Sequence, residues 1–356
     1  MEYRKIKNEY YKEKREIKYD YLRSLSCIAI VLLHVSSSYL SAVDTGTSEF
    51  LIMTIYNGLT RFAVPVFMML SGAFVLDIHK ETDILKCFRR FGKLLLNFYL
   101  WSVFFAFQGI GLKLLTGKTV TVELWKDSLQ RFLWGHYHMW FVFLILGFYL
   151  LVPILRQLVE NKKVVEYFLI LWIILRFIIP TISEWTNWYL LDSWIGRLSL
   201  NLFVGYLGYF ILGYYIRKYG VSYKKAWIIY VLGIIGLVYS LIQTVLQSHQ
   251  LGENVETFYS PSAWNVLFFS IAVFTLFSAG REMHLGEKMI IKVADCSFII
   301  YMIHPFFLEK LNMIGITTIS FNSLISIPLL TIGIFALSFL SAMIIKKIPW
   351  VNKWIL

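Results

Sequence analysis

Cysteine and charge are both scarce in this sequence. The 356 residues include three cysteines, Cys27, Cys87 and Cys296, and only 16% of the chain is charged. The cysteines show no C-x-x-C spacing, so the sequence indicates neither a disulfide framework nor a metal site, and we expect them to be packing residues. The sequence also lacks low-complexity tracts and internal repeats, which mark many secondary transporters.

Hydrophobic residues, by contrast, make up 58% of the chain and aromatic residues 18%. These values are far from those of a soluble globular protein, so we expect an all-α, polytopic membrane protein. About ten apolar runs are long enough to cross a bilayer as helices. The expected spans are residues 20–40, 51–76, 92–115, 139–158, 164–180, 197–216, 225–246, 263–280, 296–314 and 323–345.

Lysine and arginine are distributed as a ten-span topology requires. Of the 34 lysines and arginines, 25 fall in the two termini and alternate connections, and five fall in the intervening connections. Because cytosolic segments carry the excess of positive charge, both termini are predicted to be cytosolic. The distribution also explains the net charge of +12 without a nucleic-acid partner. The expected organisation is a cytosolic tail over residues 1–18, with no removable signal peptide, and one transmembrane domain over residues 19–356.

The first span carries two ionisable residues on one face. In "DYLRSLSCIAIVLLHVSSSYL", residues 20–40, Arg23 and His34 are eleven residues apart. Eleven helical residues rise about 16.5 Å and turn through about 1100°, so both side chains share a face at different depths. Ionisable groups inside a membrane normally face a bundle interior or a wet cavity, although Arg23 has the alternative of reaching lipid phosphate. His34, which precedes three serines, is therefore a candidate general base near the outer side.

Further ionisable residues are expected inside the bundle. Arg61, in "LTRFAVPVFMMLSGAF", lies too deep to reach the membrane surface easily and is a candidate for holding an anionic or carbonyl group. Arg176 and His304 lie in the fifth and ninth spans. They either stabilise the substrate or form hydrogen bonds with a neighbouring helix. At the outer entrance of the fourth span, "HYHMW" contains His138 and Trp140, which are candidates for binding an acceptor.

A basic segment precedes the third span. "KCFRRFGK" places four cations, Lys86, Arg89, Arg90 and Lys93, within two helical turns. They are either ordinary cytosolic positive charge or a clamp for phosphate groups, since guanidinium groups pair bidentately with phosphate.

These residues together resemble the acyltransferase 3 family of bacterial membrane-bound acyltransferases. The similarity rests on Arg23 and His34 with ten residues between them and on five further segments. These segments are "VPVFMMLSGAF", "CFRRFGKLLLNFYLW", "HMWFVFLILGFYLLVP", "CSFIIYMIHPFFL" and the C-terminal "IPWVNKWIL". The sequence departs from the family at Asn97, where the family often has proline, and it contains no esterase-like domain such as some members append.

The resemblance implies an O-acyltransferase of the bacterial cell membrane. It would move an acyl group, commonly acetyl, from cytosolic acyl-CoA to a carbohydrate hydroxyl of a polysaccharide or lipid-linked glycan. His34 would be the catalytic base and Arg23 its essential companion, with acyl-CoA bound by the four cations of the basic segment. Arg61 or Arg23 would stabilise the oxyanion, and a transient acyl-histidine is an alternative to direct transfer.

The expected partners are acyl-CoA as co-substrate, a glycan or glycolipid acceptor, membrane lipid and a second copy of the chain. No permanently bound cofactor or metal is expected. A second hypothesis is a glycan or lipid transporter, in which the same histidine and arginines would form a proton relay or a substrate site.

Overall fold

The computed structural model describes residues 15–77, 83–188, 190–198, 205–280 and 284–348. Most of the expected tail and the C-terminal segment from residue 349 lie outside these ranges. The described residues form helices and no strand, which confirms the all-α prediction. The helices are α2 (Ile17–Ser37), α3 (Ser48–Thr60), α4 (Ala63–Val75), α5 (Ile84–Leu115), α6 (Val122–Trp134), α7 (Trp140–Glu160), α8 (Lys162–Ile173), α9 (Ile179–Thr186), α10 (Leu190–Arg197), α12 (Leu207–Tyr219), α13 (Tyr223–Leu251), α14 (Trp264–Ser278), α15 (Glu287–Met313) and α16 (Ser323–Lys346).

Shorter or irregular turns also join these elements. They are the 3₁₀ turns η1 (Leu40–Ala42), η2 (Tyr137–Met139) and η4 (Thr257–Tyr259), and the π-helical turn η3 (Ile174–Ile178) between α8 and α9, together with the two-residue turn at positions 61–62.

Nine segments within the described ranges are long and apolar enough to cross a membrane. They coincide with nine of the ten expected spans, so the protein is a multi-pass membrane protein. The expected span over residues 197–216 differs. Most of its described part belongs to α12, which has 13 residues, and residues 199–204 lie outside the description.

Local sequence signals set where several helices begin and end. The side chains of Thr47, Asp83 and Thr121 each accept the backbone N–H three residues further on, and so cap α3, α5 and α6. The second expected span is divided between α3 and α4. Pro65 has no N–H with which to bond the carbonyl of Arg61, so the helix turns at residues 61–62 before it resumes.

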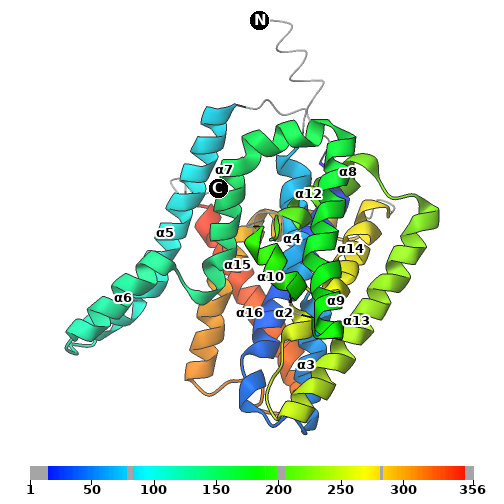
Figure 1. Cartoon of the computed structure of the whole chain (residues 1–356). Coiled ribbons are helices and arrows are strands. Elements are labelled where there is room, and N and C mark those ends of the chain that lie inside the picture. Colours follow the sequence, from blue (N-terminus) through cyan, green and yellow to red (C-terminus); the bar gives the residue numbers. More distant parts are fainter. Residues whose placement is uncertain (1–14, 78–82, 189, 199–204, 281–283, 349–356) are drawn as a thin grey trace, which may run out of the picture.

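Helix α2 lies at the centre of the bundle, as Figure 1 shows. It contacts α3, α4, α14, α15 and α16. Leu22 and Ile30 of α2 belong to one hydrophobic core, while Val31 and Val35 belong to the other. Helix α5 packs against α6 and α7, and the α5–α6 pair projects from one side of the bundle (Figure 1). The arrangement places the face that carries Arg23 and His34 inside the protein.

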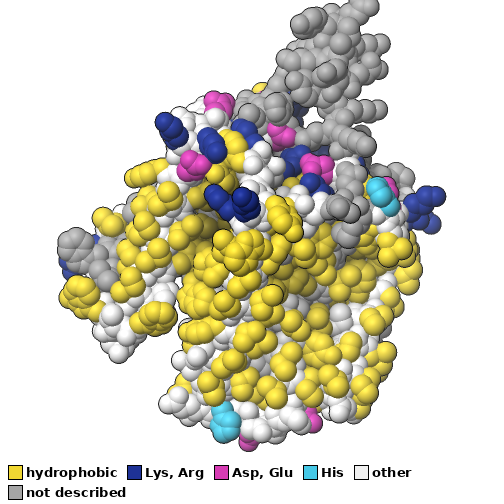
Figure 2. All heavy atoms as spheres, turned by 90° about the vertical axis from the view of Figure 1, so that its right-hand side faces the viewer, with side chains coloured by type: hydrophobic (Ala, Val, Ile, Leu, Met, Phe, Trp, Pro, Cys, Tyr) yellow, Lys and Arg dark blue, Asp and Glu magenta, His cyan; other side chains and the backbone are white. Residues whose placement is uncertain are grey.

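The surface agrees with the predicted membrane topology. On the face drawn in Figure 2, Lys and Arg side chains gather at the end of the bundle where α2 begins, and apolar side chains cover the band below them. We call this basic end the cytosolic end, in keeping with the positive-inside rule.

Glycines allow α4 and α12 to pack closely. A Cβ atom on Gly72 would lie 1.7 Å from the carbonyl oxygen of Phe210, and one on Gly213 would lie 2.0 Å from that of Met69. Close backbone approach at small residues is the main packing device of membrane helices, where lipid removes most of the hydrophobic driving force.

Gly72→Ala is therefore expected to destabilise the protein, because a backbone carbonyl has to move. Overpacking of this kind costs about 1–3 kcal/mol, which thermal unfolding of the detergent-solubilised protein would report as a lower midpoint. Gly147→Ala is the matched control, since nothing lies within 4 Å of the Cβ it would add. Equal midpoints for the two variants would contradict the close contact.

Candidate active site

Four ring side chains form a closed cluster around His34. Going round the cluster, the ring centroids are separated by 5.0 Å between His34 and His304, 5.7 Å between His304 and His138, 5.7 Å between His138 and Tyr137, and 5.5 Å between Tyr137 and His34. His138 and His304 are buried, whereas His34 is half-buried and so remains partly accessible. We refer to these four side chains as the ring cluster.

A proline in α15 determines how His304 is held. Pro305 has no N–H, so it leaves the carbonyl of Tyr301, four residues earlier, without its helical donor. Nδ1 of His304 lies 2.7 Å from this carbonyl oxygen. Because a carbonyl only accepts hydrogen bonds, Nδ1 carries the proton and Nε2 of the neutral ring is a bare acceptor.

The His-Tyr-His sequence brings His138 to the cluster from the start of α7. Gly135, with φ of +76°, makes the sharp turn that leads from α6 into η2. His136 and His138 then face each other, with 3.0 Å between their Nδ1 atoms. Nε2 of His136 lies 2.9 Å from a carboxylate oxygen of Glu309, at the outer end of α15. The Tyr301 hydroxyl donates a short hydrogen bond to the backbone carbonyl of His138, which ties η2 to α15.

A cavity of about 450 Å³ leads from the cytosolic end toward the ring cluster. Arg90 and Lys93 of α5 line it on the cytosolic side, and Arg23 lines it from α2. Its walls further in are mostly apolar and include Ile30 and Tyr301. These two residues lie about one helical turn before His34 and His304 respectively, so the lining approaches the ring cluster, although none of its four rings lines the cavity.

Arg23 is shared between this cavity and a second one of about 330 Å³. In the second cavity the two other cations, Arg15 and Arg217, each form ion pairs with acidic residues. Arg15 pairs with Asp20 and Asp295 at 2.5 and 2.8 Å, and its hydrogen bond with Asp20 raises the pKa of Arg15. Arg217 pairs with Glu16 at 2.8 Å.

Arg23, by contrast, is not paired with an acidic residue of the described part of the chain. Within the described residues it makes no ion pair and no hydrogen bond, and its guanidinium lies 6.0 Å from the ring centroid of Phe74. A half-buried cation of this kind is available to a bound anion.

The comparison with protein families decides the class of this chain. The acyltransferase 3 family model, described as "Acyltransferase domain", matches residues 16–345, which is nearly the whole chain. The chain belongs to the acyltransferase 3 family. This membership confirms the resemblance drawn from the sequence motifs and makes the protein an acyltransferase. No curated protein and no solved structure matches the chain.

In this acyltransferase, Arg61 belongs to a different cluster from the ring cluster. Its Nε lies 2.6 Å from the side-chain oxygen of Asn57, and Nη2 lies 3.3 Å from a carboxylate oxygen of Glu256. Its guanidinium also lies 4.6 Å from the ring centroid of Tyr259. The Arg61 charge is thus compensated by an acidic residue of the loop between α13 and α14.

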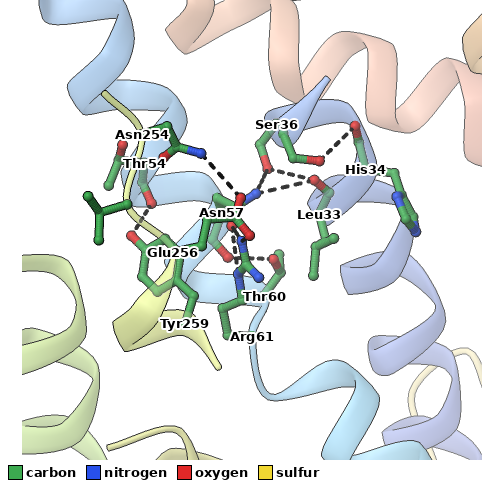
Figure 3. A network of polar contacts seen from close by, with 12 residues as sticks. Leu33, His34, Ser36, Thr54, Asn57, Thr60, Arg61, Asn254, Glu256 and Tyr259 are labelled. Carbon is green, nitrogen blue, oxygen red and sulfur yellow. Dashed lines mark hydrogen bonds and ion pairs between the residues drawn. The ribbon is translucent and has the colours of Figure 1, made fainter. Parts of the chain in front are cut away.

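Figure 3 shows how this network lies relative to His34. Asn57 reaches α2 by donating to the carbonyl of Leu33 at 3.4 Å and to the hydroxyl of Ser36 at 3.3 Å. The His34 imidazole points away from the network (Figure 3). Arg61 is therefore linked to the outer end of α2 through Asn57 and makes no hydrogen bond with the imidazole.

The remaining residues predicted to bind the acceptor or stabilise it are spread over the outer half. Trp140 begins α7, is 45% exposed, and has its ring centroid 5.6 Å from that of Tyr206. Arg176 lies in the π-helical turn η3, is half-buried, and interacts electrostatically with Tyr206 and Tyr209. Trp140 and Arg176 therefore approach the same tyrosine, whereas His138 belongs to the ring cluster.

The basic segment is divided by the cavity. Arg90 and Lys93 line it and Lys86 and Arg89 do not. Lys86 lies 3.6 Å from Asp83, and Arg89 has an exposed side chain. Asn97, at the position where the family often has proline, also lines the cavity and donates to the carbonyl of Lys93 at 2.9 Å.

Sequence reasoning missed three residues that the geometry brings to the site. They are Tyr137, His136 and Glu309. For a further residue, Tyr301, the Tyr-x-x-His-Pro sequence was a signal, because a proline leaves the carbonyl four residues before it without its helical hydrogen-bond donor. The described residues contain no group of three or more His, Cys, Asp or Glu arranged to hold a metal ion.

Proposed function

We propose that the protein is an O-acyltransferase that moves an acetyl group from cytosolic acetyl-CoA to a hydroxyl of a cell-envelope carbohydrate in the bacterial plasma membrane. The observation that carries this proposal is the cavity that runs from the cations at the cytosolic end to residues one helical turn from His34 and His304. One end of the cavity is basic and the other is mostly apolar, which matches the anionic phosphate end and the thioester arm of acetyl-CoA.

The charge and polarity of the cavity suit the donor. Acetyl-CoA has an anionic phosphate end that remains in the cytosol and a long, narrow arm that carries the thioester. Arg90 and Lys93 would hold the phosphates, and Arg23 would bind a phosphate or carbonyl oxygen further along the arm. The apolar inner walls would then guide the thioester toward His34.

His34 is the residue that we place at the reacting atoms. As a general base it would remove the proton of the acceptor hydroxyl while the oxygen attacks the acyl carbon. A transient acyl-histidine, formed by attack of His34 itself, would give the same products in two steps. The half-buried position of His34 leaves it reachable in either case.

The acceptor would approach from the outer side. Trp140 offers an exposed indole against which a sugar ring can pack, and Tyr206 and Arg176 offer polar groups beside it. An acceptor bound there would be either a surface polysaccharide or a lipid-linked glycan.

Purified protein supplied with acetyl-CoA and candidate glycans tests the proposal directly. Free CoA and the acetylated glycan are measured together, and we expect equal amounts of the two products. A glycan that crosses proteoliposome membranes without consumption of acetyl-CoA would instead support the transporter hypothesis.

Replacing the two cavity cations tests the donor site. Arg90→Ala combined with Lys93→Ala is expected to raise the KM for acetyl-CoA by at least about tenfold with a smaller change in kcat, because these residues contribute ground-state binding. Lys86→Ala combined with Arg89→Ala removes the same charge from the same helix but leaves the cavity lining intact. Similar KM increases in both double variants would show that the segment acts only through its overall charge.

A further inference from the structure

Two nitrogen atoms in the ring cluster lack a hydrogen-bond partner. Nε2 of His138 and Nε2 of His304 are fully buried, and neither has a partner among the residues that the structure describes. Buried polar atoms are almost always paired in folded proteins, so an unpaired one indicates a functional role or a missing partner. The protonation of each ring shows what that partner must be.

The bonds around His304 leave its Nε2 as an acceptor. Nδ1 donates to the Tyr301 carbonyl that Pro305 leaves free, so the neutral ring has no proton on Nε2. The missing partner of this nitrogen is therefore a hydrogen-bond donor.

The bonds around His138 lead to the same result through three groups. The carboxylate of Glu309 accepts from Nε2–H of His136, at 2.9 Å. Where His136 is neutral, its Nδ1 has no proton and accepts from Nδ1–H of His138 at 3.0 Å. In that protonation state Nε2 of His138 carries no proton and does not donate to His304. The His138 ring also interacts with the backbone of Met302.

Of the rings that contact His304, that of His34 lies nearest and is the favoured donor. The rings in contact with His304 are those of His34, His138 and Tyr301. His138 presents an acceptor, and the Tyr301 hydroxyl already donates to the carbonyl of His138. The ring centroids of His34 and His304 are 5.0 Å apart, close to the 5.1 Å between the hydrogen-bonded rings of His136 and His138. The geometry therefore allows His34 to donate with a small ring rotation.

We propose that His304 is the positioning residue of His34, accepting its N–H at Nε2 and so directing the other, proton-free nitrogen of His34 toward the acceptor hydroxyl. This role replaces oxyanion or substrate stabilisation, which the sequence suggested for His304. Glu309 and neutral His136 complete the arrangement, because in that state His138 presents an acceptor rather than a donor to His304. The arrangement corresponds to the carboxylate that orients a catalytic histidine in serine hydrolases, with a locked imidazole in place of the carboxylate.

The inference rests on the proposed function, and the atoms balance as follows. The O–H bond of the acceptor breaks as His34 takes the proton on its bare nitrogen, and a bond forms between the acceptor oxygen and the acyl carbon. The bond from that carbon to sulfur then breaks, and sulfur leaves with the electron pair and takes the proton from His34. His304 accepts a hydrogen bond throughout and gains no proton.

Two isosteres of histidine separate positioning from packing. A glutamine side chain places its carbonyl oxygen near the Nε2 position of histidine, whereas an asparagine places it near Nδ1. We expect His304→Gln to retain kcat within about tenfold and His304→Asn to lose about 100-fold, with the KM for acetyl-CoA within about threefold for both. Equal kcat values for the two variants would overturn the proposal, because both remove the same ring.

A spectroscopic measurement tests the same point without activity. In protein labelled with ¹⁵N-histidine, long-range proton–nitrogen correlations identify the protonated nitrogen of each neutral ring, and the His304 signals are assigned by their loss in His304→Gln. We expect the proton on Nδ1 of His304 in the wild type. In Pro305→Ala, the restored backbone N–H should compete for the Tyr301 carbonyl, so that the population protonated on Nε2 rises.

A wild-type His304 protonated on Nε2 would overturn the proposal whatever the variants do. This outcome is distinct from failure of the proposed function, which would appear as wild-type protein that releases no CoA and acetylates no glycan.

Discussion

Replacing His34 with alanine is expected to lower kcat for acyl transfer by about 10³-fold or more, because general-base or nucleophilic catalysis by a positioned histidine contributes on that order. The KM for acetyl-CoA should change by less than about threefold, since the cations proposed to bind the donor lie at the other end of the cavity. Free CoA release in the presence of a glycan acceptor is the measurement.

His249→Ala provides a matched control for the loss of an imidazole. His249 is exposed near the C-terminal end of α13, outside the ring cluster. We expect it to retain wild-type kcat. Glycan acetylation by His34→Ala at a rate near that of the wild type would remove His34 from the mechanism and would leave the family membership unaffected.

Arg23→Gln is expected to lower kcat/KM for acetyl-CoA by about 10- to 100-fold, because a hydrogen bond to a charged group contributes about 1.5–3 kcal/mol. The reason lies in its surroundings. Arg23 has no ion-pair partner among the described residues and faces both cavities, so its charge is free for the donor. Initial rates over a range of acetyl-CoA concentrations give the ratio.

Arg89→Gln removes one guanidinium from the same end of the protein and should leave kcat/KM within about threefold. Arg89 is exposed and does not line the cavity. If both variants behave alike, the cytosolic field as a whole, rather than a contact from Arg23, is what acetyl-CoA requires.

Much of the fold could be predicted because a bilayer restricts the chain so strongly. Apolar runs of sufficient length must be helices, and the lysine and arginine bias alternates with each crossing. The shared face of Arg23 and His34 follows from helix geometry alone, and the structure places both residues along the interior of the bundle. The division of the second span at residues 61–62 was less visible, although Pro65 was a signal for it.

The ring cluster could not be predicted from the sequence in the same way. Its members come from α2, from the turn η2 before α7, and from α15, and no local pattern states that these segments meet. Arg61 gives a second example. Its depth suggested a ligand, but its partner Glu256 lies about 195 positions away in a loop, so the pairing depends on tertiary packing.

The separation of Arg23 and His34 along α2 has a consequence for the compartments on either side of the membrane. Three helical turns cover about half of a hydrocarbon core that is roughly 30 Å thick. An acyltransferase built in this way can consume a water-soluble cytosolic thioester and esterify an alcohol that never enters the cytosol. Only the small acyl group would travel through the protein, and neither bulky substrate would have to be translocated.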